Sequence, residues 1–132
     1  MIVDSSALVA MLRGEPEGVQ FGAQISRDSD PVMSAGNYLE TSIVIDRDRD
    51  AILSANLDAL LKELKIEIAP VTAAQAKIAR QAYRDFGKGS GHPAKLNYGD
   101  CFAYALATER GEPLLYKGDD FAHAGFARAG PE

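Results

Sequence analysis

The chain has very little of what would build a disulfide framework, a zinc site or a membrane segment. It contains one cysteine and two histidines. Cys101 has no partner for an intramolecular disulfide, and neither His92 nor His123 has a second ligand at zinc-binding spacing. No apolar run approaches the roughly 18 residues of a membrane helix, and no signal-type segment precedes the first apolar residues. We therefore expect a cytoplasmic protein without a membrane partner, in which Cys101 is a packed thiol.

Length and composition fit one domain. The chain has 132 residues, of which 46% are hydrophobic, and this is enough for one core. We expect a single domain over residues 1–132, because no internal repeat, long linker or low-complexity segment divides the chain. The net charge of −5 would by itself argue against a nucleic-acid ligand. That argument is weak here, because basic residues gather between residues 77 and 95.

Short apolar strands alternate with helices along the chain. Strands are expected at residues 1–3, 31–34, 66–69 and 113–116, and helices fill most of the segments between them. This alternation is typical of a mainly parallel sheet covered by helices on both faces, with right-handed crossovers. The sequence therefore predicts an α/β fold.

Local patterns predict how some of these elements begin and pack. Ser5 or Ser6 is expected to cap the first helix. Residues 117–120 are expected to form a turn after the last strand. The helix that follows Ser34 is expected to bury one apolar stripe, which includes Leu39, Ile43 and Val44.

Four carboxylates stand beside these apolar segments, where a buried ion without a partner costs several kcal/mol. Asp4 and Asp119 each follow a predicted strand. Asp100 lies in the first turn of a helix, and Glu40 shares a helix face with apolar neighbours and should point inward. In parallel sheets, ligands bind beyond the carboxyl ends of the strands, at a switch point in strand order. We therefore expect the four acids to converge on one site.

Oxygen ligands without histidine or cysteine select Mg²⁺ or Mn²⁺ over zinc. Such a site can activate a bound water and offset the charge of a phosphate, which predicts a hydrolase acting on nucleic acid. Ser6, beside Asp4, is a candidate to orient a water or a phosphate oxygen, although capping fits it equally well.

Each acid also has a simpler interpretation. Asp4 could only cap a helix, and Glu40 could be the ion-pair partner of an arginine. Asp100 could only interact with a helix dipole, and Asp119 could belong to an ordinary turn. These interpretations do not explain why all four map to one end of the sheet.

Basic residues form a second candidate feature. Lys77, Arg80 and Arg84 are spaced to share one face of a helix, and Lys88 and Lys95 continue the stripe in the following Gly-rich loop. Such a stripe beside an acidic metal site could hold an RNA backbone that the carboxylates alone would repel. The alternative is a solvated helix face.

Four motifs, in order, span nearly the whole chain: MIVDSSALVA, NYLETSIVI, LNYGDCFAYALA and LLYKGDDFA. Together they resemble the PIN-domain ribonucleases, and specifically the VapC toxins of bacterial toxin–antitoxin pairs. Asp4, Glu40 and Asp100 match the three main acids of that family, and Asp119 matches its more variable fourth. A one-residue alignment error would exchange Asp119 with Asp120.

The resemblance implies a three-layer α/β/α sandwich with a central, mainly parallel sheet of four to five strands. It also implies Mg²⁺- or Mn²⁺-dependent endoribonuclease activity, homodimers, and hetero-oligomers with a cognate VapB-type antitoxin. Antitoxins of this type often place an arginine against the acidic site, where it can pair with the carboxylates. Two alternatives remain open from the residues alone, a non-catalytic RNA- or antitoxin-binding module and a nuclease acting on DNA.

Overall fold

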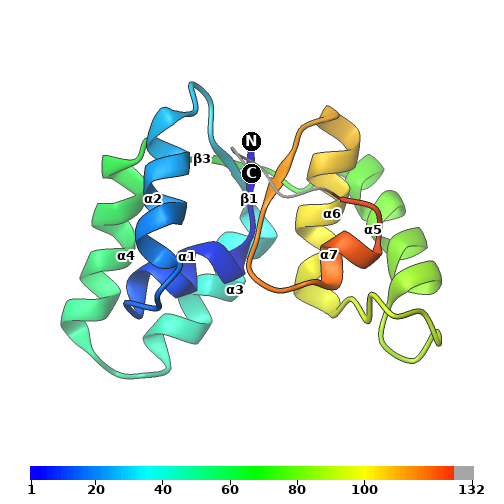
Figure 1. The fold of residues 1–132 in the computed structure, drawn as a ribbon, viewed down its shortest axis with the longest axis horizontal. Helices are drawn as coiled ribbons and strands as arrows, with labels where there is room; N and C mark the ends of the chain where they lie inside the picture. Colours follow the sequence, from blue (N-terminus) through cyan, green and yellow to red (C-terminus); the bar gives the residue numbers. More distant parts are fainter. Residues whose placement is uncertain (127–132) are drawn as a thin grey trace.

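A parallel sheet of four short strands forms the centre of the computed structural model, which describes residues 1–126 (Figure 1). The strands follow the spatial order β3-β2-β1-β4, and all of their pairings are parallel. The predicted parallel sheet is therefore confirmed, with four strands. Their bounds are Ile2–Val3 for β1, Val32–Ser34 for β2, Glu67–Ala69 for β3 and Leu114–Leu115 for β4.

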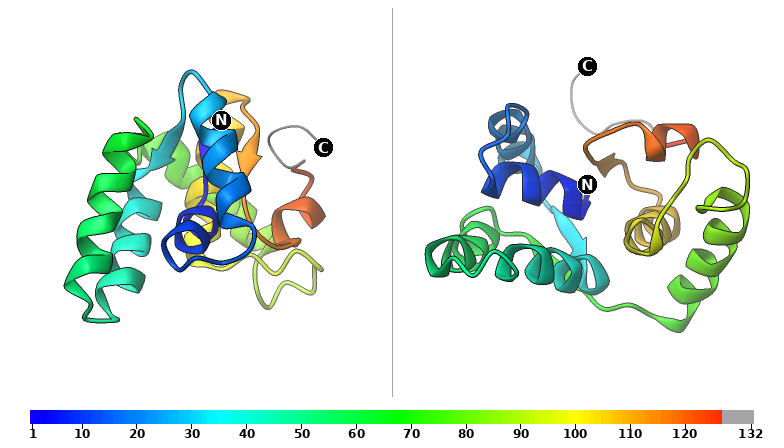
Figure 2. Two further views of the ribbon diagram at one scale, coloured as in Figure 1. Left: turned by 60° about the vertical axis from the view of Figure 1, so that its left-hand side comes forward. Right: turned by 90° about the horizontal axis from the view of Figure 1, so that it is seen from below.

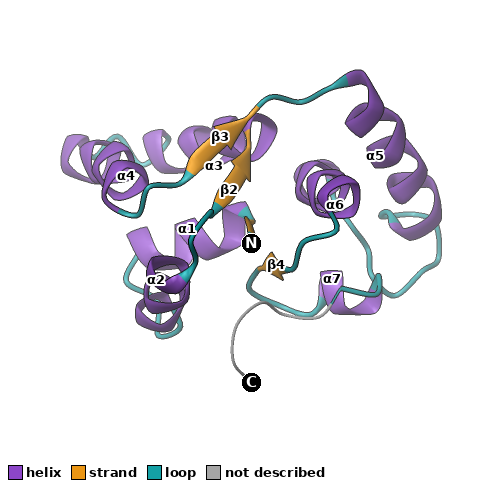
Figure 3. Cartoon of the chain, turned by 90° about the horizontal axis from the view of Figure 1, so that it is seen from above, coloured by secondary structure: helices purple, strands orange, loops and turns teal. Residues whose placement is uncertain are grey.

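Helices cover both faces of this sheet. α1, α2 and α4 lie on one side and α5, α6 and α7 on the other, while α3 packs against α1, α4 and α6 (Figures 2 and 3). This arrangement confirms the three-layer sandwich. No helix in residues 1–126 is long and apolar enough to cross a membrane. The helices are α1 (Ser5–Leu12), α2 (Gly18–Arg27), α3 (Ala35–Asp46), α4 (Ala51–Glu63), α5 (Ala73–Phe86), α6 (Tyr98–Arg110) and α7 (Asp120–His123).

Alternate residues of the strands supply two separate cores. Val3 and Leu115 belong to the core shared with α1, α2 and α4. Ile2 and Leu114 belong to the core shared with α6 and Phe121 of α7. The alternation follows from the two-residue period of a strand. It also fixes the face of the sheet toward which the side chain of the residue after each strand points.

The start of α1 differs from the prediction. Neither Ser5 nor Ser6 caps this helix. Asp4 is the N-cap, and its side chain accepts the backbone N–H of Ser6 at 3.0 Å. Aspartate is a preferred cap, so this simpler interpretation of Asp4 is correct, but the cap uses only one of its two carboxylate oxygens.

The predicted apolar stripe of α3 was wrong. Leu39 and Ile43 are 59% and 51% exposed, whereas the buried residues of α3 are Asn37, Thr41 and Ile45. α3 therefore turns a mostly polar face toward α1 and α6. The short helix α7 was also missed, because four residues carry too little periodicity to separate a helix from a turn.

Candidate active site

The structure brings Asp4, Glu40 and Asp100 together at the carboxyl ends of the strands. β1 delivers Asp4 at the start of α1, β2 leads into α3 with Glu40, and the first turn of α6 carries Asp100. β1 lies between β2 and β4. After β1, the chain adds β2 and then β3 on one side of it, and later adds β4 on its other side. That is the switch point where ligands bind in such sheets.

Burial and mutual repulsion raise the pKa values of two of these acids. Burial raises the pKa of Asp4 from its usual 3.8 to about 6, and the charge of Glu40 adds to the rise. Burial likewise raises the pKa of Asp100 to about 7, with further contributions from the charges of Asp4, Asp120 and Glu40. Carboxylates in this arrangement are unfavourable as ions unless a cation joins them.

Asp4 is almost fully buried, and its two oxygens have different surroundings. Oδ2 accepts the Ser6 backbone N–H at 3.0 Å and the Ser6 hydroxyl at 2.6 Å. Oδ1 is buried and has no hydrogen-bond partner in the described part of the chain. An acceptor left in this state costs free energy, which a ligand at Oδ1 would recover.

Glu40 is half-buried and is held from two sides. Its Oε1 accepts the Ser5 hydroxyl at 2.6 Å and the Asn37 side-chain N–H at 3.3 Å. The carboxylate lies directly against the Cα of Gly99 in α6, where any Cβ would overlap it. The sequence suggested an arginine partner as one alternative, but the hydrogen bonds of Glu40 come from a serine and an asparagine.

Asp100 belongs to a capping box. Its Oδ2 accepts the Asn97 backbone N–H at 2.9 Å, and the Asn97 side chain accepts the Asp100 backbone N–H at 2.9 Å. This reciprocal pair fixes the first turn of α6, as is usual for the motif. The expected position of Asp100 in that turn is confirmed.

The three acids share one pattern: within residues 1–126, hydrogen bonds reach one carboxylate oxygen of each acid and not the other. The held oxygens are Asp4 Oδ2, Glu40 Oε1 and Asp100 Oδ2. In residues 1–126, no group of three or more His, Cys, Asp or Glu is arranged to hold a metal ion directly. Mg²⁺ usually contacts only one or two carboxylates and keeps several waters. The orphaned Asp4 Oδ1 and the all-oxygen donor set therefore fit such an ion.

The fourth acid lies in the segment between β4 and α7. Asp119 and Asp120 are both exposed, and Asp119 is the N-cap residue of α7. Burial is the main cause of the raised Asp100 pKa, and the charge of Asp120 adds to it after that of Asp4. The assignment of Asp119 stays a prediction, and the charge of Asp120 supports the alternative.

Ser6 ties this segment to Asp4. Its hydroxyl donates to Asp4 Oδ2 and accepts the Lys117 backbone N–H at 2.9 Å. The Lys117 ammonium pairs with Glu15 and, at 3.5 Å, with Glu17 in the loop between α1 and α2. The Ser6 hydroxyl therefore positions Asp4 and the β4–α7 segment together.

The predicted basic residues are all exposed, and they lie along α5 and in the loop that follows it. Lys77 lies near the start of α5, and Arg84 near its end, where it pairs with Asp85 at 3.6 Å. Lys88 and Lys95 lie in the loop that leads into the first turn of α6. In sequence, these two loop lysines are closer to Asp100 than Lys77 and Arg80 are.

Three residues that support the acids were missed from the sequence: Ser5, Asn37 and Gly99. Ser5 was interpreted only as a possible cap, and a buried asparagine has no sequence signature. Cys101 is buried, as expected of a packed thiol, and this burial raises its pKa to about 11.

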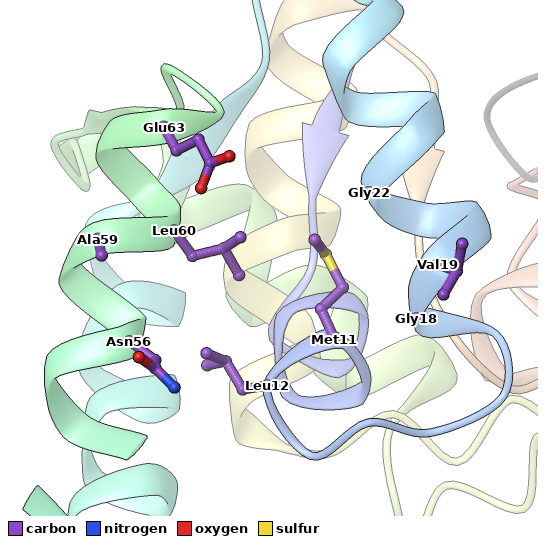
Figure 4. Close-up of a pocket in the computed structure, with 9 residues that line it drawn as sticks. All are labelled: Met11, Leu12, Gly18, Val19, Gly22, Asn56, Ala59, Leu60 and Glu63. Carbon is purple, nitrogen blue, oxygen red and sulfur yellow. The ribbon is translucent and has the colours of Figure 1, made fainter. Parts of the chain in front are cut away.

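A groove lies away from the acids, between α1, α2 and α4. It has a volume of about 440 Å³, and Figure 4 shows Leu60 and Glu63 of α4 facing Met11 across it. Val19 on its rim is 85% exposed. The lining residues are Met11, Leu12, Gly18, Val19, Gly22, Asn56, Ala59, Leu60 and Glu63.

Comparison with known proteins agrees with this fold. The PIN domain family matches residues 1–127. Among solved structures, VapC20 of Mycobacterium tuberculosis, described as a Sarcin-Ricin loop cleaving toxin, shares the fold, with a TM-score of 0.74 and 19% identity over 98% of both chains. A toxin–antitoxin complex from Klebsiella pneumoniae shares it too, with a TM-score of 0.69 and 16% identity over 92% of this chain and 89% of that chain.

The chain therefore belongs to the PIN-domain family, and its curated relatives there are VapC ribonucleases. Ribonuclease VapC28 of Mycobacterium tuberculosis is 50% identical over 129 residues, which cover 98% of this chain and 97% of the relative. Ribonuclease VapC42 of the same organism is 47% identical over 123 residues, covering 93% of this chain and 94% of the relative.

Proposed function

We propose that the chain, as one PIN domain, is a toxin endoribonuclease that hydrolyses RNA phosphodiester bonds in the cytoplasm. The supporting observation is the cluster of Asp4, Glu40 and Asp100, in which two pKa values are raised and one buried oxygen lacks a partner. The 50% identity to VapC ribonucleases, over 98% of this chain, supports RNA as the substrate.

In this proposal Asp4 and Asp100 are the principal ligands of Mg²⁺ or Mn²⁺, and Glu40 and Asp119 or Asp120 act through water or on a second ion. The ion would supply an activated water and neutralise charge on the phosphate. Ser6 holds Asp4 and the β4–α7 segment in register. The RNA backbone is contacted by Lys88 and Lys95, and farther from the acids in sequence by Lys77, Arg80 and Arg84. The salt dependence of RNA binding, measured for Lys88→Gln and Lys95→Gln variants, tests these contacts.

The direct test is incubation of the purified chain with single-stranded RNA and with DNA of the same sequence, each with Mg²⁺ and with a chelator. Cleavage of RNA that requires Mg²⁺ is expected. Cleavage of DNA alone would replace RNA with the alternative substrate. Binding of RNA without cleavage would support the non-catalytic module.

Thermal stability should respond to Mn²⁺ in a pH-dependent way. Asp4 and Asp100 have folded-state pKa values above the usual 3.8, so their protonated forms favour the folded state. In the metal-free chain, this stabilisation is complete below the usual value and is lost as the pH rises through about 6 for Asp4 and about 7 for Asp100. Mn²⁺ at 100 times its Kd should then restore about 2.7 kcal/mol.

The restored stability should be larger near about pH 7.5 than near about pH 5, because protons compete with the ion for the same carboxylates. Scanning calorimetry over a Mn²⁺ titration at both pH values measures this. The Asp100→Asn variant is the control, and its metal-free form should melt higher and respond less to Mn²⁺. An unchanged melting temperature at every Mn²⁺ concentration would contradict a metal site at these acids.

We propose that the α1–α2–α4 groove binds a segment of the cognate VapB-type antitoxin. Apolar side chains such as Met11, Leu12 and Leu60 line much of the groove, and Glu63 offers one negative charge, which suits an apolar segment with a basic residue. Val19→Asp should weaken binding by at least about tenfold, because it places a charge on the apolar rim. The free toxin should cleave RNA as before.

The matched control is Ile52→Asp, because Ile52 is also exposed, at 74%, but lies outside the groove. Co-purification with the product of the adjacent reading frame measures binding for both variants. An equal loss of binding in both variants, or no loss in either, would contradict the assignment of the groove.

A homodimer is also proposed, with its face on the exposed apolar residues Leu39 and Ile43 of α3 and Tyr98 of α6. The ring of Phe102 lies against Gly36 and contacts Tyr98 edge-on, which joins the two helices into one surface. The molar mass of the purified chain in solution, measured by light scattering, tests this.

A further inference from the structure

Asn37 lies where three elements of the site meet. Its side chain is fully buried, and its Nδ2 donates to the backbone oxygen of Gly99 in α6 at 2.9 Å and to Glu40 Oε1 in α3 at 3.3 Å. Its own backbone oxygen accepts the Ser5 hydroxyl of α1 at 3.2 Å. One residue thus joins the helices that follow Asp4, carry Glu40 and present Asp100.

These contacts determine which oxygen of Glu40 is available. Ser5 and Asn37 both donate to Oε1, and no hydrogen bond within residues 1–126 is made to Oε2. Oε2 lies closest to Gly99, the residue immediately before Asp100. A glutamate has several rotatable bonds, so two donors on one oxygen remove most of its freedom to turn away.

We propose that Asn37 is a positioning residue of the active site. It orients Glu40 so that Oε2 lies against Gly99 in the first turn of α6, and it fixes that turn, and with it Asp100, against α3. Asn37 touches neither substrate nor reacting atoms. The inference rests on the proposed metal-dependent cleavage and assigns to Asn37 a role behind the acids.

A purely structural role would give a different result. In that case the amide only satisfies the buried Gly99 oxygen, and its loss lowers thermal stability without changing how the site binds metal. A positioning role predicts that metal affinity and turnover change as well. Supporting residues behind metal ligands typically contribute about 10–100-fold to affinity or activity.

The test uses Asn37→Asp, which keeps the shape of the side chain and replaces the donor with an acceptor. We expect the Mn²⁺ concentration for half of the thermal stabilisation to rise, and kcat for RNA cleavage at saturating Mn²⁺ to fall, each by about 10–100-fold. Ser5→Ala is the second variant. It removes the other donor to Glu40 Oε1 and leaves α6 untouched, so it reports on the same orientation if Asn37→Asp does not fold.

Thr41→Val is the matched control. Thr41 lies one turn farther along α3 and is fully buried, and its hydroxyl has no hydrogen-bond partner in the described residues. This variant should keep the wild-type half-saturating Mn²⁺ concentration and kcat.

The outcomes separate this inference from the proposed function. A wild-type chain that neither binds Mn²⁺ nor cleaves RNA would overturn the proposed function, and the role of Asn37 with it. A wild-type chain that does both, with Asn37→Asp and Ser5→Ala indistinguishable from Thr41→Val, would overturn the role of Asn37 alone.

Discussion

Asp4→Asn and Asp100→Asn should each reduce RNA cleavage by more than about 100-fold, the upper end of what residues behind metal ligands contribute. Each replaces a carboxylate with a neutral amide and removes the charge that would hold the ion. The amide oxygen can still accept the bond that the chain donates, from Ser6 to residue 4 and from Asn97 to residue 100. Both variants should therefore fold.

Asp50→Asn is the matched control, because it makes the same chemical change at another helix cap. Asp50 accepts the backbone N–H groups of Ile52 and Leu53 at the start of α4 and is exposed. It should cleave RNA like the wild type. Rates from a fluorescent RNA, with circular dichroism to verify folding, measure all three. Wild-type rates in both Asp4→Asn and Asp100→Asn would overturn the site.

Gly99→Ala should reduce cleavage about 10–100-fold without unfolding α6, since it displaces a supporting contact of the proposed metal site. A Cβ at position 99 would overlap the Glu40 carboxylate, which must then leave its bonds to Ser5 and Asn37. The helix itself should gain, because alanine is favoured over glycine in a helix by about 0.5–1 kcal/mol. Loss of activity in a stable helix is the expected signature.

Gly22→Ala in α2 controls for the substitution. Its new Cβ would meet only Met11 Cε, at 3.1 Å, and that flexible side chain can move. The half-saturating Mn²⁺ concentration and the cleavage rate should change for Gly99→Ala and stay constant for Gly22→Ala. Full activity of Gly99→Ala would mean that Glu40 does not depend on its place against α6.

The main acids could be predicted from the sequence because their neighbours are apolar. A carboxylate directly after an apolar strand, such as Asp4, is a pattern that can be seen in the local sequence. Because it follows a strand, Asp4 could also be placed at the carboxyl end of the sheet. The capping box around Asp100 is local too, since Asn97 and Asp100 are three residues apart. The element order and the parallel sheet followed from the same short-range patterns.

The support of Glu40 could not be predicted in this way. Its partners Ser5 and Gly99 are far away in sequence, and they meet only because α1, α3 and α6 pack together. The buried face of α3 carries Asn37 and Thr41, so a pattern based on hydrophobicity identifies it as the exposed face. The choice between Asp119 and Asp120 likewise depends on where α7 begins.

The two oxygens of each acid differ in what they contact, and this difference has a consequence for the cell. In the proposed function, the oxygen that holds the fold and the oxygen that meets the ion are separate atoms of one side chain, so a single Asp-to-Asn change should silence the nuclease and leave a folded protein. Neither Asp4 nor Asp100 is among the residues that line the α1–α2–α4 groove, so either change would leave its lining intact. Such a silent copy would compete with active copies for the same antitoxin, and one point mutation would convert a toxin into a decoy.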